Sequence, residues 1–346
     1  MDDLTENALA ISDDEDIRLT MVFGFILTLV SIFCNTLWFL SHFAIFLIHY
    51  FIVLLILLCV VSKFIKLNSI SFESIQKVFI PNGYPLSYLG SVFDVPENSK
   101  ASFEYSCSHN CPRIFFSLDM TECGQLVVLD KQTLEKANIH TPINKTKFDE
   151  IKNLNISDSH PLGKQFGYQK ILTLDALLKI LEPLNVVVIL NATRTGSSFI
   201  EKLKQTISTH DPMFTKKIIF CCRSPIVVYK LRKLFPNLMC AIWIDNLSSW
   251  RNNKRIFKLL TILRSIHDVL LRNLIGPIIG ISLVFVHKDE FNTHISELWQ
   301  NCGVIPIVYF VNSPSEKRYY QNVIKTRYLT SSLRSEPQII FNNNKI

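Results

Sequence analysis

The longest apolar run of the chain lies near the N-terminus. From Leu19 to Ser62 there are 44 residues without an Asp, Glu, Lys or Arg. A bilayer core about 30 Å thick needs about 20 helical residues, so the run is long enough for two spans. We predict a transmembrane helical hairpin with helices over 20–40 and 43–62 and a break at Ser41 and His42. One span followed by an interfacial helix is the alternative.

Further along the chain, short apolar runs alternate with stretches of helical spacing. The predicted strands are 114–118, 125–129, 186–190, 217–222, 239–243, 279–286, 305–311 and 328–330. The predicted helices are 173–181, 197–208, 225–235, 254–274, 292–301 and 314–325. Strands that are apolar on both faces and alternate with helices indicate a parallel sheet covered by helices. About eight such units in about 250 residues fit an α/β fold of the (β/α)8 TIM-barrel type, with a doubly wound open sheet as the alternative.

These patterns divide the chain into five parts. We predict an acidic tail over 1–18, a membrane anchor over 19–63, a connector over 64–82, a barrel over 83–337 and a C-terminal tail over 338–346. Any chemistry is expected in the barrel, on the face where the strands end.

The charge of the chain is unevenly distributed. The first 18 residues sum to −6 and the remainder to +13, which gives the net charge of +7. A basic remainder suits anionic lipids or nucleic acid. No arginine-rich run or aromatic nucleic-acid signature accompanies it, so we expect no nucleic-acid partner and a solvated, lysine-rich surface. The acidic leader also disfavours a signal peptide.

Few residues at the ends of the predicted strands have side chains that could act in catalysis or bind a metal. The residues at these ends are Asp119, Asp130, Asn191, Cys222, Ile244, His287 and Asn312. Asp119 and Asp130 could share a cation, and His287 could act as a base. Such residues are more often held in structural hydrogen bonds than used as ligands, and the sequence has neither a catalytic triad nor a metal-ligand cluster.

Several segments, taken in order, resemble the glycerophosphodiester phosphodiesterases. They are Pro96-Glu97-Asn98, TECGQLVVLDKQTLEKAN at 121–138, FCCRSPIVVYKLRKLFPN at 220–237, GISLVFVHKD at 280–289, CGVIPIVYFVN at 302–312 and YLTSS at 328–332. The resemblance covers about residues 80–337 and is closest to the membrane-anchored members of the family. It implies a TIM barrel that binds Mg²⁺ or Ca²⁺ and cleaves glycerophosphodiesters, with two histidines as general acid and base.

The resemblance also implies where the reactive groups belong, and this chain has other residues there. The family's first His-Arg pair falls on Tyr88 and Leu89, and its second His on Asp130. Its metal-ligand positions fall on Phe115, Ser117 and Asn191. An apolar ring in a cation site removes charge, so we predict that no metal is bound tightly.

Some motif residues of the family are retained. They are Pro96, Glu97, Asn98, Gly124, Lys288 and Asn312. We expect most of them to serve as scaffold. Asp119 and Asp130 are the substitutes from which a metal site could be rebuilt.

The two sides of a membrane are indicated by different signals. Lys63 and Lys66 favour a cytosolic barrel by the positive-inside rule. Sequons at Asn144, Asn155, Asn191 and Asn246 and the family resemblance favour a lumenal or extracellular barrel in an endomembrane or the plasma membrane. We prefer the lumenal or extracellular placement. The glycosylation candidates are Asn144, Asn155 and Asn246, and Asn191 is excluded because it ends a buried strand.

Together these features predict a membrane-anchored, catalytically degraded phosphodiesterase-like protein of (lyso)glycerophospholipid metabolism. Such a protein would have a binding or regulatory role. Its expected partners are membrane lipids, and its expected ligand is a glycerophosphodiester or a lysophospholipid. The alternative is an active metal-dependent hydrolase with a rebuilt site. A transporter role for the apolar run has little support, because histidine is its only ionisable side chain of the kind that marks a pathway.

Overall fold

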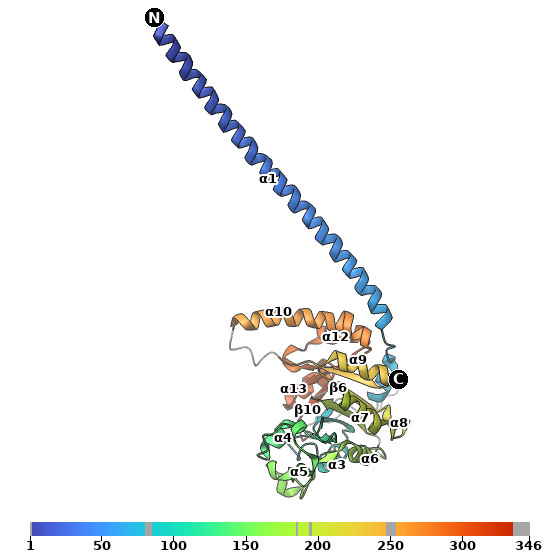
Figure 1. Cartoon of the computed structure of the whole chain (residues 1–346). Helices are drawn as coiled ribbons and strands as arrows, with labels where there is room; N and C mark the ends of the chain where they lie inside the picture. Colours follow the sequence, from blue (N-terminus) through green and yellow to red (C-terminus); the bar gives the residue numbers. More distant parts are fainter. Residues whose placement is uncertain (1, 80–84, 185, 194–195, 247–253, 335–346) are drawn as a thin grey trace. The chain divides into compact units, whose positions relative to one another are not determined.

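The computed structural model describes residues 2–79, 85–184, 186–193, 196–246 and 254–334 (Figure 1). The chain divides into two compact units, Met1–Ile65 and Lys66–Ile346.

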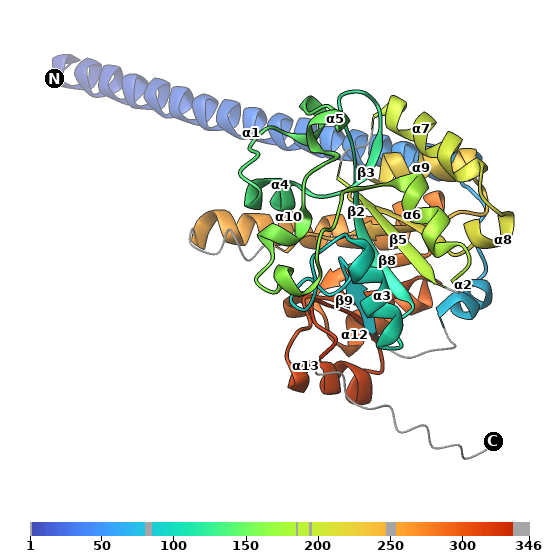
Figure 2. The same cartoon turned by 90° about the horizontal axis from the view of Figure 1, so that it is seen from below.

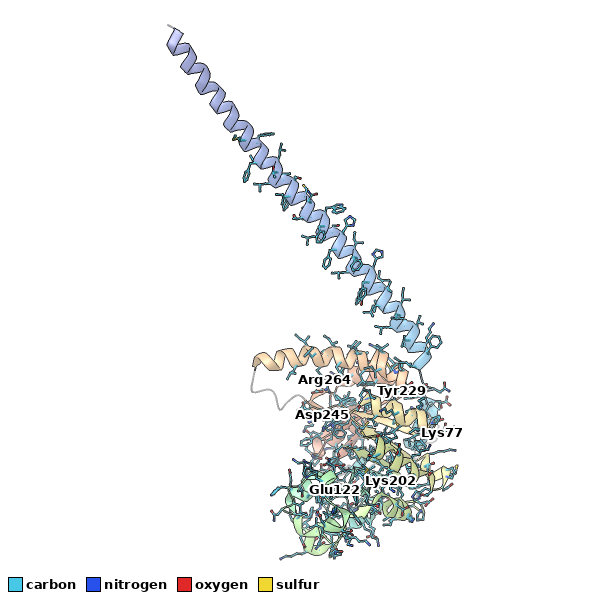
Figure 3. All side chains as sticks on the ribbon, in the orientation of Figure 1. Lys77, Glu122, Lys202, Tyr229, Asp245 and Arg264 are labelled. Carbon is cyan, nitrogen blue, oxygen red and sulfur yellow. The ribbon has the colours of Figure 1, made fainter. Side chains whose placement is uncertain are left out.

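The first unit is one α-helix, α1 (Asp2–Ile65), so the predicted helical hairpin is wrong. The apolar run has no proline, and several of its polar side chains hydrogen-bond within the helix. Thr36 Oγ1 donates to the carbonyl of Phe33 at 2.8 Å, and His49 Nδ1 lies 2.9 Å from the carbonyl oxygen of Ile45. Polar residues that bond to the preceding turn do not end a helix. By length and composition, Phe23–Ile65 could cross a membrane, and its side chains project from the helix on all sides (Figure 3).

The second unit is a closed barrel of eight parallel strands, as predicted. They are β1 (Pro85–Tyr88), β2 (Arg113–Met120), β5 (Val187–Ala192), β6 (Ile218–Cys222), β7 (Met239–Trp243), β8 (Leu283–His287), β9 (Ile305–Tyr309) and β10 (Arg327–Thr330). The strands pair in this order, and β1 closes the barrel by pairing with both β10 and β2. Figure 2 shows strands such as β2, β5 and β8 surrounded by helices. The four-residue β1 is the one barrel strand that the apolar pattern did not predict.

The helices of the crossovers cover the outside of the barrel. They include α3 (Lys100–Ser108), α6 (Leu174–Leu181), α7 (Ser197–Ser208), α9 (Pro225–Leu234), α10 (Lys254–Leu270), α11 (Gly276–Ile279), α12 (Thr293–Asn301) and α13 (Pro314–Arg318). In α6 the buried residues are Leu174, Leu177, Leu178 and Leu181, which is the spacing of one helix face. Short π-helical turns, Leu271–Ile275 and Tyr319–Val323, follow α10 and α13.

An insertion follows β2 before the chain returns to the barrel at β5. β3 (Leu126–Val128) pairs antiparallel with β2, and β4 (Leu172–Thr173) pairs antiparallel with β3. With α4 (Lys131–Lys136) and α5 (Phe148–Ile151) they enclose a separate small core that includes Leu134 and Ile156. The insertion thus extends the barrel at the C-terminal end of β2.

One further helix, α2 (Phe72–Phe79), lies within the predicted connector. Its Ile75 is buried against the residues that fill the barrel, and Phe72 and Val78 pack beside it. The preceding segment is fixed by a 2.8 Å hydrogen bond from the amide of Leu67 to the carbonyl of Ile278, just before β8. We infer from this bond that α2 covers the N-terminal end of the barrel, opposite the face where the strands end.

Candidate functional site

The C-terminal ends of the strands meet on one face of the barrel, which is where this fold places functional sites. A cavity of about 120 Å³ opens there. Tyr88, Trp243 and Tyr309, the last residues of β1, β7 and β9, line it. The rest of the lining is Phe310, Leu329 and Ser331. The mouth of the barrel is therefore largely aromatic.

Phe115 continues this aromatic cluster into the barrel. Its ring centroid lies 5.6 Å from that of Tyr88, and 5.4 Å from those of both Trp243 and Phe285. The side chain is only 1% exposed. This is the position at which the sequence resemblance implies a metal-binding carboxylate. A phenyl ring offers a cation no lone pair, so it packs as core and contributes no ligand.

The loop after β1 has an unusual backbone. Leu89, Gly90 and Ser91 have φ angles of 49°, 77° and 76°, in the left-handed region that non-glycine residues seldom adopt. A Cβ atom at Gly90 would lie 2.2 Å from the side chain of Ser102, so only glycine fits there. Leu89, at the position of the family's arginine, is 2% exposed and packs in the barrel core. The loop therefore has the glycine of the His-Arg-Gly motif without its polar side chains.

Three acidic or phenolic groups distant in sequence are brought together beside this loop. Glu97 is 4% exposed and accepts hydrogen bonds from Thr133 Oγ1 at 2.7 Å and Lys136 Nζ at 2.9 Å. Asp130 caps α4 by accepting from the amide of Thr133 at 2.9 Å. Tyr88 and Asp130 occupy the two positions where the resemblance implies histidines, and Tyr88 is close enough to feel the negative charges of Asp130 and Glu97.

The pKa values of these groups show the effect of burial and like charge. Burial and the negative charge of Glu97 raise the pKa of Asp130. Burial, together with the charges of Asp130 and Glu97, raises the pKa of Tyr88 to about 12. At neutral pH the phenol stays protonated, so Tyr88 is a hydrogen-bond donor and not a general base.

Asn98 supplies a second donor at the same end of β2. It is fully buried, and its Oδ1 accepts from the amide of Ser117 at 3.2 Å. Its Nδ2 has no hydrogen-bond partner among the described residues. A buried amide donor without a partner is costly unless an acceptor reaches it. A ligand oxygen is one such acceptor.

Asp119 and Asp130, predicted as a cation pair, have different partners. Asp119 accepts from the amide of Met120 at 2.8 Å and from Thr193 Oγ1 at 3.1 Å. Asp130 is held by Thr133, and the charges that shift its pKa come from Glu97 and Lys136. Across the described residues, no group of three or more His, Cys, Asp or Glu side chains is placed to hold a metal ion. With Phe115 and Ser117 at two ligand positions, these residues do not fit the Mg²⁺ or Ca²⁺ site that the family implies.

His287, predicted as a candidate base, is held as a neutral ring. Its Nδ1 accepts from the amide of Asp289 at 3.2 Å and lies 3.0 Å from Nδ2 of Asn246. Burial lowers its pKa, which favours the neutral form. The nitrogen that would take a proton is therefore already engaged.

Several motif residues serve as scaffold around the site. Asn312 Oδ1 accepts from the amide of Ser331 at 2.8 Å, which joins the loops after β9 and β10. Lys288 Nζ pairs with Glu316 Oε1 at 2.5 Å. Gly124 has a φ of 77° in the turn between β2 and β3, and the carbonyl of Pro96 accepts from Ser99, which caps α3. Asn191 lies half-buried within β5.

Two features of the site were not predicted from the sequence. Trp243, Tyr309 and Phe310 were read only as strand residues, although aromatic residues at the ends of two predicted strands were the available signal. Asp94 was overlooked. It is buried and accepts from Ser332 Oγ at 3.0 Å and from the amide of Leu333 at 2.8 Å, which ties the loop after β1 to the loop after β10.

Comparison with known proteins gives the relationship. The chain is 23% identical over 291 residues to glycerophosphodiester phosphodiesterase 1 of Bos taurus, and the match covers 79% of this chain and 87% of that protein. The Homo sapiens protein of the same name is 24% identical over 294 residues, with the same coverage. The chain is therefore similar to glycerophosphodiester phosphodiesterases over most of its length. No family model matches it.

Solved structures of the family have the same fold. Glycerophosphodiester phosphodiesterase from Agrobacterium tumefaciens has a TM-score of 0.55 at 15% identity, covering 72% of this chain and 96% of that one. An Oleispira antarctica phosphodiesterase, solved with the product sn-glycerol-3-phosphate, has a TM-score of 0.57 at 15% identity, covering 73% and 95%. The family resemblance is confirmed. The sequence resemblance implies other residues at the positions of Tyr88, Phe115 and Asp130.

Proposed function

We propose that the protein binds the headgroup of a glycerophosphodiester or a lysophospholipid at the mouth of its barrel and does not hydrolyse it. The observation that supports this most strongly is the replacement at Phe115. An apolar ring fills the position of a metal-binding carboxylate, while the surrounding pocket remains open. A site that keeps its cavity and loses its reactive groups is suited to binding.

The chemistry of phosphodiester cleavage explains why these replacements matter. Charge develops on the phosphoryl oxygens and needs stabilisation, and the leaving alkoxide needs a proton donor. Each acid or base group contributes about 10²–10⁴-fold to such a reaction. Tyr88, with a pKa of about 12, stays protonated at neutral pH and cannot serve as the general base. The carboxylate of Asp130 already accepts a hydrogen bond as the cap of α4.

The protein is further proposed to be anchored in a membrane through α1. Residues Phe23–Ile65 form a 43-residue apolar segment, which at 1.5 Å per residue is about 65 Å long. That is about twice the hydrocarbon thickness of a bilayer, so part of the segment can span the membrane while the rest extends beyond it. The barrel is proposed to face the lumen or the cell exterior.

Equilibrium binding to the full chain tests this function. The purified protein in detergent would be titrated with glycerophosphocholine, glycerophosphoinositol and a lysophospholipid, followed by calorimetry. Saturable binding of at least one ligand is expected, and Asp149→Ala, a change at an exposed carboxylate of α5, should leave it unchanged. The absence of binding by every ligand would overturn the proposal. The rebuilt-site alternative predicts metal-dependent turnover of the same ligands instead.

A further inference from the structure

We propose that the cavity at the barrel mouth accepts a quaternary ammonium group, as found in phosphocholine headgroups. This inference rests on the proposed function and specifies its ligand class. The cavity is the one lined by Tyr88, Trp243, Tyr309 and Phe310 together with Leu329 and Ser331.

The lining supplies aromatic rings and few polar groups. The rings of Trp243 and Tyr309 are stacked with centroids 4.2 Å apart, and Phe115 lies behind them. The hydroxyl of Tyr309 is committed to the carbonyl of Ile244 at 2.9 Å. Aromatic rings attract cations, and quaternary ammonium ligands are recognised by cages of such rings. A cavity of this composition therefore favours a cation that needs no hydrogen bonds.

The chemistry of the headgroups makes this a selective argument. A trimethylammonium group has positive charge and no N–H donor, so an apolar pocket leaves none of its hydrogen bonds unmade. An ethanolamine ammonium has three donors, and an inositol ring has several hydroxyls, and the hydroxyls of Tyr88 and Ser331 are too few to replace the water that these groups would lose. The cavity volume of about 120 Å³ is also modest, since an apolar cavity of about 150 Å³ holds a molecule the size of benzene.

Charge around the cavity favours a zwitterion. Negative charges of Asp130 and Glu97 act on Tyr88, and those of Asp245, labelled in Figure 3, and Glu290 act on Tyr309. Lys288 lies beside one lining residue, with its Nζ 5.7 Å from the centroid of the Phe310 ring. Glu97, Asp245, Glu290 and Lys288 each have an ion-pair partner, namely Lys136, Arg223, Arg264 and Glu316. The charges around the cavity are therefore largely balanced, which suits a zwitterion better than a ligand with a net charge.

The backbone of Phe310 gives an independent indication. Its φ is 72°, a conformation that is rare for an aromatic residue, and its side chain is 58% exposed. Strained backbone persists where the surrounding structure holds it, and it is concentrated at binding sites. Here it places the Phe310 ring at the opening of the cavity. Because this ring is largely exposed, packing in the core does not explain its position.

The test compares headgroups and two matched variants of the full chain in a detergent without ammonium groups. Calorimetry would measure binding of glycerophosphocholine, glycerophosphoethanolamine and glycerophosphoinositol. Glycerophosphocholine should bind at least about 10-fold more tightly than the other two, and Phe310→Ala should weaken it by about 3- to 30-fold. Phe93→Ala removes a ring that is 61% exposed and outside the cavity lining, so it should have no effect. Lysophosphatidylcholine and lysophosphatidylethanolamine in nanodiscs, as a further arm, distinguish a lipid headgroup from the soluble diester.

Each outcome decides one claim. Equal binding of the three soluble diesters, or no effect of Phe310→Ala, overturns the headgroup inference and leaves the proposed function standing. If no soluble diester binds, binding of lysophosphatidylcholine but not of lysophosphatidylethanolamine supports the inference for a lipid ligand, and equal binding of the two lipids overturns it. No binding of any diester or lysophospholipid overturns the proposed function as well. Because Phe310 is exposed, loss of binding in its variant cannot be attributed to a collapsed barrel, and an unchanged melting temperature would verify this.

Discussion

At the scale of single residues, Phe115 is the clearest difference between this site and the site that the family resemblance implies. It is a core residue of the barrel at a position where the resemblance implies a metal ligand, and it contacts the rings of Tyr88, Trp243 and Phe285. The same ring occupies the position where a reactive group is implied, and it packs against Tyr88 and Trp243, which line the aromatic cavity. Under the proposed function, the loss of catalysis and the gain of a binding surface would be one structural change.

Phe115→Ala is expected to reduce the free energy of unfolding by about 3–5 kcal/mol, because it removes a fully buried ring from a packed core. Phe115→Glu should destabilise as well, since it places an unpaired carboxylate among aromatic rings. Urea denaturation of the full chain measures both, with Phe93→Ala expected within about 0.5 kcal/mol of the native chain. A fully stable Phe115→Glu variant would mean that the position still accommodates a carboxylate.

Asp130 gives a prediction about pH. Its pKa is raised in the folded protein above the usual 3.8, by burial and by Glu97. The contribution of Asp130 to stability is thus full below 3.8 and is lost as the pH rises through the folded pKa. Asn caps helices as well as Asp does, so Asp130→Asn keeps the cap and removes the charge.

The stability gained by Asp130→Asn should therefore be larger at pH 7 than near pH 4. Denaturation of both proteins across this range measures the difference. A difference that is the same at all pH values would show that Asp130 has no raised pKa. Asp149→Asn, at an exposed site, serves as the control.

The sequence could identify which reactive residues are missing and which residues replace them, but not how the replacing side chains are arranged in space. Tyr88, Trp243 and Tyr309 are far apart in the chain and meet only because the barrel closes in one register. Which side chains share a cavity depends on the direction of each strand end. A motif comparison reads positions one at a time and contains no such information.

At the scale of elements, strands and helices differ in how well their patterns reveal them. Barrel strands were found because both faces are apolar, and α6 because its leucines follow one helical face. The hairpin prediction failed because hydropathy measures the length of an apolar run and not where it bends. Ser41 and His42 are compatible with a continuous helix, and α1 passes through them.

The helix α2 was not predicted because it is short and partly polar, yet it is structurally important. Ile75→Ala should lower the free energy of unfolding by about 2–5 kcal/mol, since Ile75 is buried against the barrel interior. Lys77→Ala, at an exposed position of the same helix (Figure 3), should change it by less than about 0.5 kcal/mol. Thermal or urea denaturation measures both. Equal changes in the free energy of unfolding for the two variants would show that Ile75 does not pack against the barrel interior.

At the scale of the whole molecule, the proposed membrane anchor raises the question of which side of the membrane the barrel faces. Of the predicted acceptors, Asn144 is exposed. The amide of Asn155 is engaged, accepting from the amide of Gln169 at 2.8 Å and donating to Asp158 at 2.6 Å. Asn246 contacts His287. A lumenal barrel should therefore be glycosylated mainly at Asn144.

Expression of the full chain in animal cells tests this compartment. Asn144→Gln should abolish most of the mobility shift that a glycosidase produces, and Asn191→Gln, at a half-buried strand residue, should leave the shift unchanged. A native chain whose mobility does not respond to glycosidase would place the barrel in the cytosol instead.

The central claim is that this barrel binds a phosphodiester without cleaving it. The most direct measurement is ³¹P NMR of glycerophosphocholine incubated with the full chain and excess Mg²⁺ or Ca²⁺, with an active family enzyme as positive control. We predict that the phosphodiester resonance persists unchanged in intensity while calorimetry on the same sample shows binding. Growth of a phosphomonoester resonance that requires the metal and disappears in Asp130→Ala would contradict the claim and show a rebuilt hydrolase.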